Sequence, residues 1–205
     1  MLEAGYAIWP GVSAEVLAGC LRLTEARVEG GGTRRLFERI PELADLLVDV
    51  NAGPDMVLCR SIPFDKTAES NWKVGWHQDV TLACEARFEK EGWTNWTVKE
   101  GVPHVQPPVA VLEQMLTLRL HLDPCGPDKG PLRVLPGSHR LGKLSAEQIQ
   151  HQVRSQVAVE CLCEAGEILA MRPLLVHSSG SALRPGRRRV IHLEFCPTRA
   201  IPVSS

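Results

Sequence analysis

Short apolar segments separated by glycine- and proline-containing turns fill the chain from residue 55 onward, and they restrict the fold more than any other feature of the sequence. The segments that read as strands are 56–63, 74–82, 116–122, 132–135, 158–163, 168–171 and 190–195. Strands of this length and spacing are typical of a β-sandwich or a barrel. We therefore expect a mainly β core over residues 55–198.

The segment 1–54 shows a mainly helical pattern. Residues 6–9 are a short strand candidate, and Ser13 is a suitable N-cap for the helix that follows. A second helix is expected over 33–50, with Pro41 as a kink or a break. The apolar stripes of these helices are expected to be core faces that pack on the β region.

Length and composition agree with a single domain over residues 1–205, because 44% hydrophobic residues suffice for a full core. The formal net charge of −1 gives no general attraction to nucleic acid or to an anionic membrane, so neither is an expected partner. No apolar run approaches the roughly 18 residues of a membrane helix, and no secretory signal is visible. The cytoplasm is the expected location, whereas the oligomeric state is unknown from the sequence.

The chain has seven cysteines, an odd number, and no Cys-x-x-Cys pair. They are scattered through apolar stretches, which favours buried reduced thiols. A disulfide framework is therefore not expected.

Two segments that are distant in the sequence carry candidate metal ligands, Trp76-His77-Gln78-Asp79 and Pro173-Leu174-Leu175-Val176-His177. On a strand, side chains i and i+2 point to one face, so His77 and Asp79 can bind one ion while Gln78 faces away. His177 can complete the set. Two imidazoles and one carboxylate on one side of an ion leave the opposite positions open, as in non-haem Fe(II) oxygenases. His-x-Asp alone also occurs by chance, so the second segment is essential to this interpretation.

A turn-rich run follows His177 and leads to Arg188, at the start of the last expected strand. A planar, always charged guanidinium is suited to binding a carboxylate through two parallel hydrogen bonds. The four arginines within 184–189 would also fit a phosphate-binding patch, but the cluster is small. We favour a clamp for a dicarboxylate co-substrate, with solvated neighbours.

Three motifs are shared with a known family: Trp76-His77-Gln78-Asp79, Gly130-Pro131-Leu132-Arg133-Val134-Leu135-Pro136-Gly137-Ser138-His139, and Gly166-Glu167-Ile168-Leu169-Ala170-Met171. Through them the chain resembles the phytanoyl-CoA dioxygenase-like family of Fe(II)- and 2-oxoglutarate-dependent oxygenases over about residues 55–195. The family more often has aspartate where this chain has Glu167. The resemblance implies a double-stranded β-helix of the jelly-roll or cupin type, with the N-terminal helices packed on its major sheet.

The resemblance also implies residue roles. His77, Asp79 and His177 would be the catalytic iron ligands, and Arg188 and Ser179 would bind the distal carboxylate of 2-oxoglutarate. Fe(II) would be the cofactor and O2 the second co-substrate of a hydroxylation that releases succinate and CO2. Related halogenases carry a small residue in place of the aspartate, so Asp79 favours hydroxylation. The alternative is a metal-binding non-oxygenase on the same scaffold, either a sensor or binding protein or a divalent-metal hydrolase or isomerase.

The expected strand 116–122 alternates leucines with Thr117, Arg119 and His121. If the leucines pack against the outer helices, the polar side chains line the cavity, where a buried arginine needs an anion. The alternative is a solvent-facing strand surface. The cavity interpretation favours a small, polar or anionic organic substrate, and phytanoyl-CoA is doubtful because no large basic surface for the coenzyme phosphates is identifiable.

The connection 84–108 is long for a compact domain and contains Trp93 and Trp96. We expect a lid or substrate-contact loop, ordered when the active site is loaded; a structural flap over a sheet edge is the alternative. Three further polar residues precede the metal motif, Lys66, Asn71 and Lys73. They could reach the co-substrate or the substrate, and spacing does not single out which.

Overall fold

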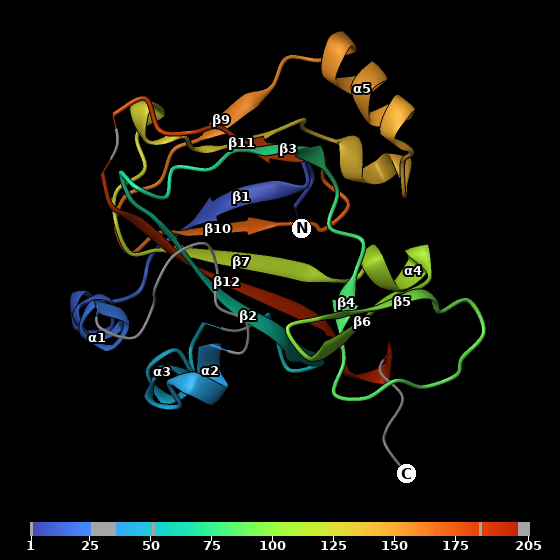
Figure 1. Cartoon of the computed structure of the whole chain (residues 1–205), viewed down its shortest axis with the longest axis horizontal. Helices are drawn as coiled ribbons and strands as arrows, with labels where there is room; N and C mark the ends of the chain where they lie inside the picture. Colours follow the sequence, from blue (N-terminus) through green and yellow to red (C-terminus); the bar gives the residue numbers. More distant parts are fainter. Residues whose placement is uncertain (1, 26–35, 51, 185, 201–205) are drawn as a thin grey trace.

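Two facing antiparallel sheets form the body of the computed structural model, which describes residues 2–25, 36–50, 52–184 and 186–200 (Figure 1). The major sheet has the spatial order β1 (Tyr6–Trp9), β10 (Ile168–Met171), β7 (Leu116–His121), β12 (Arg188–Pro197) and β2 (Met56–Lys66). The minor sheet has the order β3 (Val74–His77), β11 (His177–Ser179), β8 (Leu132–Val134) and β9 (Val159–Cys161). This mainly β architecture confirms the expected fold class.

The N-terminal helices lie along one side of the major sheet (Figure 1). They are α1 (Ala14–Glu25), α2 (Leu36–Arg39) and α3 (Glu42–Leu46). The Ser13 hydroxyl accepts a hydrogen bond from the Val16 backbone N–H at 3.2 Å, so the expected N-cap of α1 is present. The helical segment expected over 33–50 breaks at Pro41 into α2 and α3 in its described part, which is the break that this proline was expected to allow. Residues 33–35 lie outside the described residues.

The alternation of β7 divides the interior into two compartments. Its even-numbered residues pack with the helices and with one face of β12 in a single apolar cluster, whose members include Cys20, Leu36, Leu43, Leu118, Leu120, Ile191 and Leu193. Thr117, Arg119 and His121 are buried on the opposite face, toward the minor sheet. Because these side chains are buried, the solvent-facing alternative is wrong, whereas their lining of a substrate cavity stays a prediction.

The expected strand 74–82 is wrong as one element. It divides into β3 of the minor sheet and β4 (Leu82–Ala83), which belongs to a third sheet with β6 (Val102–Gln106) and β5 (Thr94–Lys99). The segment 84–108 is therefore largely a β-hairpin rather than an irregular loop. Asn95 and Glu100, at φ 55° and 51°, allow the bends that the hairpin needs.

Two helices had no counterpart in the strand pattern, α4 (Val109–Leu112) and α5 (Ala146–Ser155). The start of α5 has a readable signal, because the side chains of Ser145 and Gln148 each bond the other's backbone N–H in a capping box. The seven cysteines are free and six are buried, as expected. No helix among the described residues is both long enough and apolar enough to cross a membrane.

The apolar cluster between β7 and the helices is expected to dominate stability. Leu120→Ala should lower the free energy of unfolding by about 2–5 kcal/mol, because Leu120 is fully buried and the helices cannot collapse completely into the space left. Leu183→Ala is the matched control, since Leu183 is 82% exposed. Urea denaturation of both variants checks this, and equal losses would contradict it.

Candidate active site

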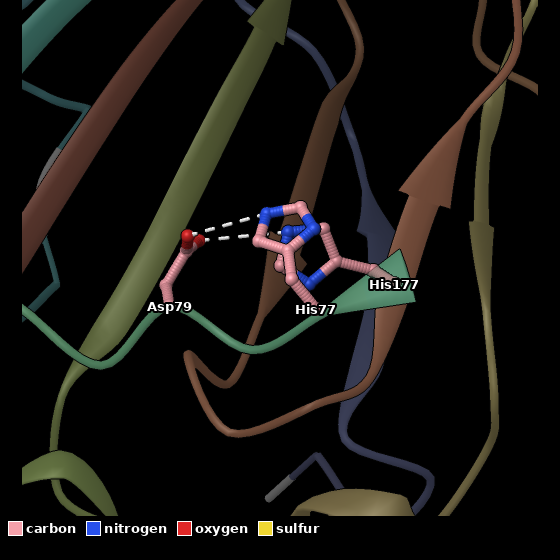
Figure 2. A group of neighbouring side chains, drawn as sticks. All are labelled: His77, Asp79 and His177. Carbon is pink, nitrogen blue, oxygen red and sulfur yellow. Dashed lines mark ion pairs between the residues drawn. The ribbon is translucent and has the colours of Figure 1, made fainter. Parts of the chain in front are cut away.

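The three expected metal ligands lie close together and point toward one another (Figure 2). His77 ends β3, His177 begins β11, and the two are register partners. Asp79 lies two residues beyond β3, and its backbone N–H is fixed by the Pro173 carbonyl at 2.9 Å. The two Asp79 carboxylate oxygens lie 3.6 Å from Nε2 of His77 and of His177, respectively. The i, i+2 argument therefore reached the right pair, although Asp79 is not on a strand.

Hydrogen bonds orient both imidazoles. Nδ1 of His77 lies 2.8 Å from the Gly75 carbonyl, and Nδ1 of His177 lies 2.8 Å from the Leu175 carbonyl. A carbonyl only accepts, so each Nδ1 carries the proton and each Nε2 lone pair points toward Asp79. Histidines that bind metals usually have their second nitrogen held in this way. The donor set of two imidazoles and one carboxylate therefore fits divalent iron.

The protonation states also favour cation binding. Burial lowers the pKa of His177 to about 4, so its imidazole is neutral near pH 7. Burial alone would raise the pKa of Asp79, but the nearby histidines and Arg60 bring it down to about 2. A neutral imidazole and an ionised carboxylate are the forms that bind a metal ion.

Residues of two of the shared motifs position the metal ligands through hydrogen bonds to the segment before His177. The Gln78 side chain faces away from the ligands and donates to the Leu174 carbonyl at 2.7 Å. Ser138, in the Pro-Gly-Ser-His motif, accepts a hydrogen bond from the backbone N–H of Val176 at 2.8 Å. That motif therefore positions the residue preceding His177, while His139 stays outside the metal group.

A second group of buried side chains is cationic. Arg188, the first residue of β12, is 4% exposed and donates to the Gly130 carbonyl at 2.6 Å. Its register partner Lys66 is 1% exposed and donates to the Ser179 hydroxyl at 3.3 Å and to the Gly180 carbonyl at 2.7 Å. The structure thus joins both expected carboxylate-binding residues with Lys66, which spacing alone did not single out.

Gly130 makes this arrangement possible. It has φ 62°, and a Cβ there would lie 2.4 Å from the Gly180 carbonyl oxygen. Only glycine fits such a close approach of two backbones without strain. The first residue of the second shared motif therefore supplies the carbonyl that orients Arg188.

The cation group has no carboxylate partner among the described residues. Lys66, Arg119 and Arg188 form none of the ion pairs seen in this part of the chain. Burial lowers the pKa of Lys66 to about 8, and burial likewise lowers the pKa of Arg119 to about 10. Buried charge without a partner is costly, so an anion bound beside these side chains would stabilise them.

The central strand adds further unpaired polar atoms. Thr117 Oγ1, both ring nitrogens of His121, and Nε of Arg119 and of Arg188 are buried without a hydrogen-bond partner in the described part of the chain. Burial lowers the pKa of His121 to about 3, so its imidazole is neutral. The polar face expected to contact the substrate is therefore buried, and its substrate contact stays a prediction.

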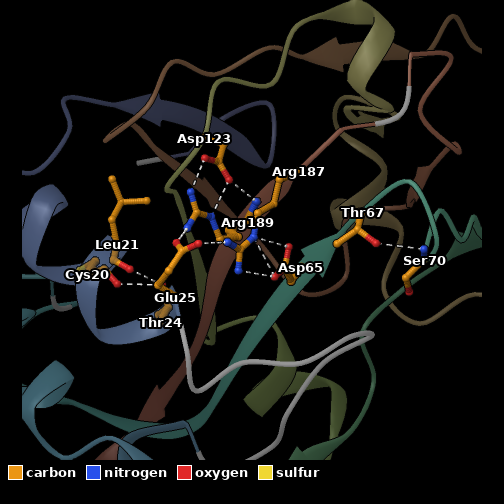
Figure 3. A network of polar contacts seen from close by, with 10 residues as sticks. All are labelled: Cys20, Leu21, Thr24, Glu25, Asp65, Thr67, Ser70, Asp123, Arg187 and Arg189. Carbon is orange, nitrogen blue, oxygen red and sulfur yellow. Dashed lines mark hydrogen bonds and ion pairs between the residues drawn. The ribbon is translucent and has the colours of Figure 1, made fainter.

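The neighbours of Arg188 are ion-paired, so the expectation that they are solvated is wrong. Figure 3 shows Arg187 with Asp65 and Arg189 with Asp123, at 3.0 and 2.7 Å, while both arginines contact Glu25 at the end of α1. Alternation on β12 explains the difference, because Arg187 and Arg189 point away from the cavity that Arg188 enters. They connect α1 to β2, to β12 and to Asp123, two residues beyond β7, rather than binding a phosphate.

The two tryptophans expected near the substrate pack together through Phe88. Its ring centroid lies 5.0 Å from each of Trp93 and Trp96. Trp93 is 7% exposed in an apolar cluster beneath the hairpin. The structure does not bring them into the group formed by the metal ligands and the buried cations.

Comparisons with known proteins agree with this geometry. The family model for phytanoyl-CoA dioxygenase matches residues 35–190. A search of curated proteins finds no match.

Similar solved structures include EctD from S. alaskensis with 2-oxoglutarate and 5-hydroxyectoine, with TM-score 0.70, 18% identity and coverage of 97% of this chain and 74% of that one. HygX from Streptomyces hygroscopicus with iron bound has TM-score 0.67, 16% identity and coverage of 96% and 83%. SnoK, a non-heme alpha ketoglutarate dependent carbocyclase from nogalamycin biosynthesis, has TM-score 0.68, 16% identity and coverage of 95% and 80%.

Iron and 2-oxoglutarate, which the sequence resemblance implies for this chain, are thus bound in some of these neighbours. At such identities the neighbours establish the fold, whereas the family model covers most of the chain. The chain belongs to the phytanoyl-CoA dioxygenase family.

Proposed function

We propose that this chain is an Fe(II)- and 2-oxoglutarate-dependent dioxygenase that hydroxylates a small, polar or anionic organic substrate and releases succinate and CO2. The observation that carries the proposal is the presence of two features side by side in the sheets. His77, Asp79 and His177 lie together as a metal-binding group, and Lys66, Arg119 and Arg188 are buried without carboxylate partners among the described residues. A protein that only senses or binds a metal ion would not need the buried, unpaired cations.

Each group has a defined part in this proposal. His77, Asp79 and His177 hold the iron, which together with 2-oxoglutarate and O2 supplies the oxidising chemistry. Arg188, Lys66 and Ser179 bind the distal carboxylate and fix the orientation of the co-substrate. The β-strand wall excludes water from the reacting atoms.

Thr117 and His121 contact the substrate, because their unpaired polar atoms would otherwise remain buried without partners. Hydroxylation is the proposed outcome, although the neighbour SnoK shows that this fold also supports carbocyclisation. The hairpin β5–β6 acts as the lid, with Trp93 and Trp96 as its apolar base. The expected cytoplasmic location stays a prediction.

Arg188→Ala should abolish or strongly weaken co-substrate binding. Under anaerobic conditions, wild-type protein with Fe(II) and 2-oxoglutarate should give a weak visible charge-transfer band, and the variant should require far more 2-oxoglutarate. Arg184→Ala is the matched control, because the Arg184 side chain is 85% exposed. The proposal is checked by titrating 2-oxoglutarate while the absorbance of this band is followed. Succinate release is then measured with a library of candidate metabolites as substrates.

A closed four-ligand zinc site with no succinate formed from any substrate would instead favour a non-oxygenase. If Arg188→Ala gives the same band at the same 2-oxoglutarate concentrations as the wild type, Arg188 does not bind the co-substrate.

The affinity for 2-oxoglutarate should fall as the pH rises through about 8. The charged form of Lys66 binds the carboxylate, and burial has lowered the pKa of Lys66 to about 8, so a higher pH removes this charge. In Lys66→Met the affinity should be lower below pH 8 and should lack this decline. Calorimetry on Mn(II)-loaded protein between pH 6.5 and 9.5 measures both curves, and parallel curves would disprove the assignment.

A further inference from the structure

Three neighbouring side chains of the major sheet keep buried polar atoms without hydrogen-bond partners among the described residues. Thr117 of β7 and Arg60 of β2 are both register partners of Glu194 of β12, so the three lie in one row across three strands. Register partners point to the same face of a sheet, and here that face is opposite the one that packs on the N-terminal helices. We call Thr117, Glu194 and Arg60 the polar row.

Glu194 uses only one of its two carboxylate oxygens. Nδ1 of His192 lies 2.9 Å from the Arg119 guanidinium, which only donates, so the proton of this imidazole is on Nε2. That Nε2 donates to Oε1 of Glu194 at 2.8 Å, and Nη2 of Arg60 donates to the same oxygen. Oε2 is buried and has no partner in the described part of the chain. Glu194 is therefore held in place with one acceptor left over.

Arg60 and Thr117 show the same pattern. Nη2 of Arg60 contacts Glu194, and Nη1 lies 3.5 Å from Nε2 of His104 on β6, while Nε is buried without an acceptor among the described residues. Thr117 is fully buried, and its hydroxyl has no partner there either. The polar row thus offers one acceptor, one donor and one hydroxyl that can act as both. Buried polar atoms are rarely left unpaired, so this set points to a bound polar group.

The polar row lies beside the metal ligands and far from Arg188 and Lys66. A carboxylate oxygen of Glu194 lies within 4.8 Å of one of Asp79. Arg188 lies six residues before Glu194 on the same face of β12, which is roughly 20 Å along the strand. In the proposed function the distal carboxylate of 2-oxoglutarate is bound at that other end. The polar row is therefore left for the molecule that is oxidised.

The charges of the polar row favour an uncharged ligand. The guanidinium of Arg60 already neutralises the carboxylate of Glu194. A further charge buried beside this pair would lose its hydration without gaining an unpaired opposite charge. A hydroxyl or an amide can donate to Oε2 of Glu194 and accept from Nε of Arg60 without that cost.

We infer that the polar row binds the primary substrate through an uncharged group that both donates and accepts hydrogen bonds, a hydroxyl or an amide. The inference rests on the proposed function and narrows its substrate class, because it requires such a group near the metal ligands. Thr117 and Glu194 then determine specificity for the substrate rather than for 2-oxoglutarate.

Three-carbon compounds that differ in charge test this selectivity. Propionamide is uncharged, propylammonium is a cation, and propanesulfonate is an anion that coordinates metal ions weakly. Each is added to Mn(II)-loaded protein saturated with 2-oxoglutarate, and NMR measures the paramagnetic relaxation of its protons by the metal ion. Zn(II)-loaded protein gives the diamagnetic blank. Propionamide should be relaxed about 3-fold more than either charged compound.

Thr117→Val removes the hydroxyl of the polar row and keeps the shape of the side chain. It should reduce the relaxation of propionamide about 3-fold or more, whereas Thr117→Ser, which keeps a hydroxyl, should retain most of it. The melting temperature of Thr117→Val should not fall, because the hydroxyl that is lost has no partner in the protein. Thr24→Val is the matched control, since the buried Thr24 hydroxyl already donates to the Cys20 carbonyl at 2.8 Å. This control should leave the relaxation of propionamide unchanged.

The inference is overturned if a charged compound is relaxed as strongly as propionamide, if no compound is relaxed above the blank, or if Thr117→Val leaves propionamide unchanged. A lower melting temperature of Thr117→Val would also overturn it, since the hydroxyl would then have a structural role. In each case the charge-transfer band of wild-type protein with Fe(II) and 2-oxoglutarate still supports the proposed function. If that band is missing while propionamide is relaxed in a Thr117-dependent way, the proposed function fails and the polar row remains a binding site.

Discussion

The antiparallel register that joins β7, β12 and β2 is the constraint on which the rest of the structure depends. It directs Leu118, Leu120 and Ile191 into the apolar cluster with the helices, and it directs Arg119 and His192 into the cavity. Because side chains alternate with a period of two, a slip of one residue would exchange these faces, burying charge among leucines. Stability and the layout of the active site therefore depend on the same pairing.

The cavity keeps a feature that stability alone would not favour. Lys66, Arg119 and Arg188 are at least nine-tenths buried without a carboxylate partner among the described residues, whereas Arg187 and Arg189, on the outer face, are fully ion-paired. Burying an unpaired charge opposes folding, so a ligand that supplies the missing anions should also stabilise the protein. This contrast between inward and outward arginines separates the proposed binding site from a structural ion-pair network.

Much of the fold and the metal group could be predicted from local patterns. The strand at 168–171 and the N-cap at Ser13 followed from alternation and capping chemistry, and the three metal ligands followed from their residue types. The hairpin over 84–108 was not predicted, because β5 is mostly exposed and its pairing with β6 joins residues that no local pattern links. Lys66 was not singled out, because its burial depends on β2 pairing with β12, which no local window contains.

The sequence by itself determined the alternation of apolar and polar residues, the positions of the turns, and a donor set suited to divalent iron, since these are properties of neighbouring residues. Tertiary structure alone decided that Lys66 joins Arg188 and Ser179, and that His192 and Glu194 connect Arg119 to the vicinity of Asp79. The physical reason is that strand pairing joins residues that are distant in the chain. Only the assembled sheets remove water from the charges and give each an electrostatic environment that its neighbours in sequence do not supply.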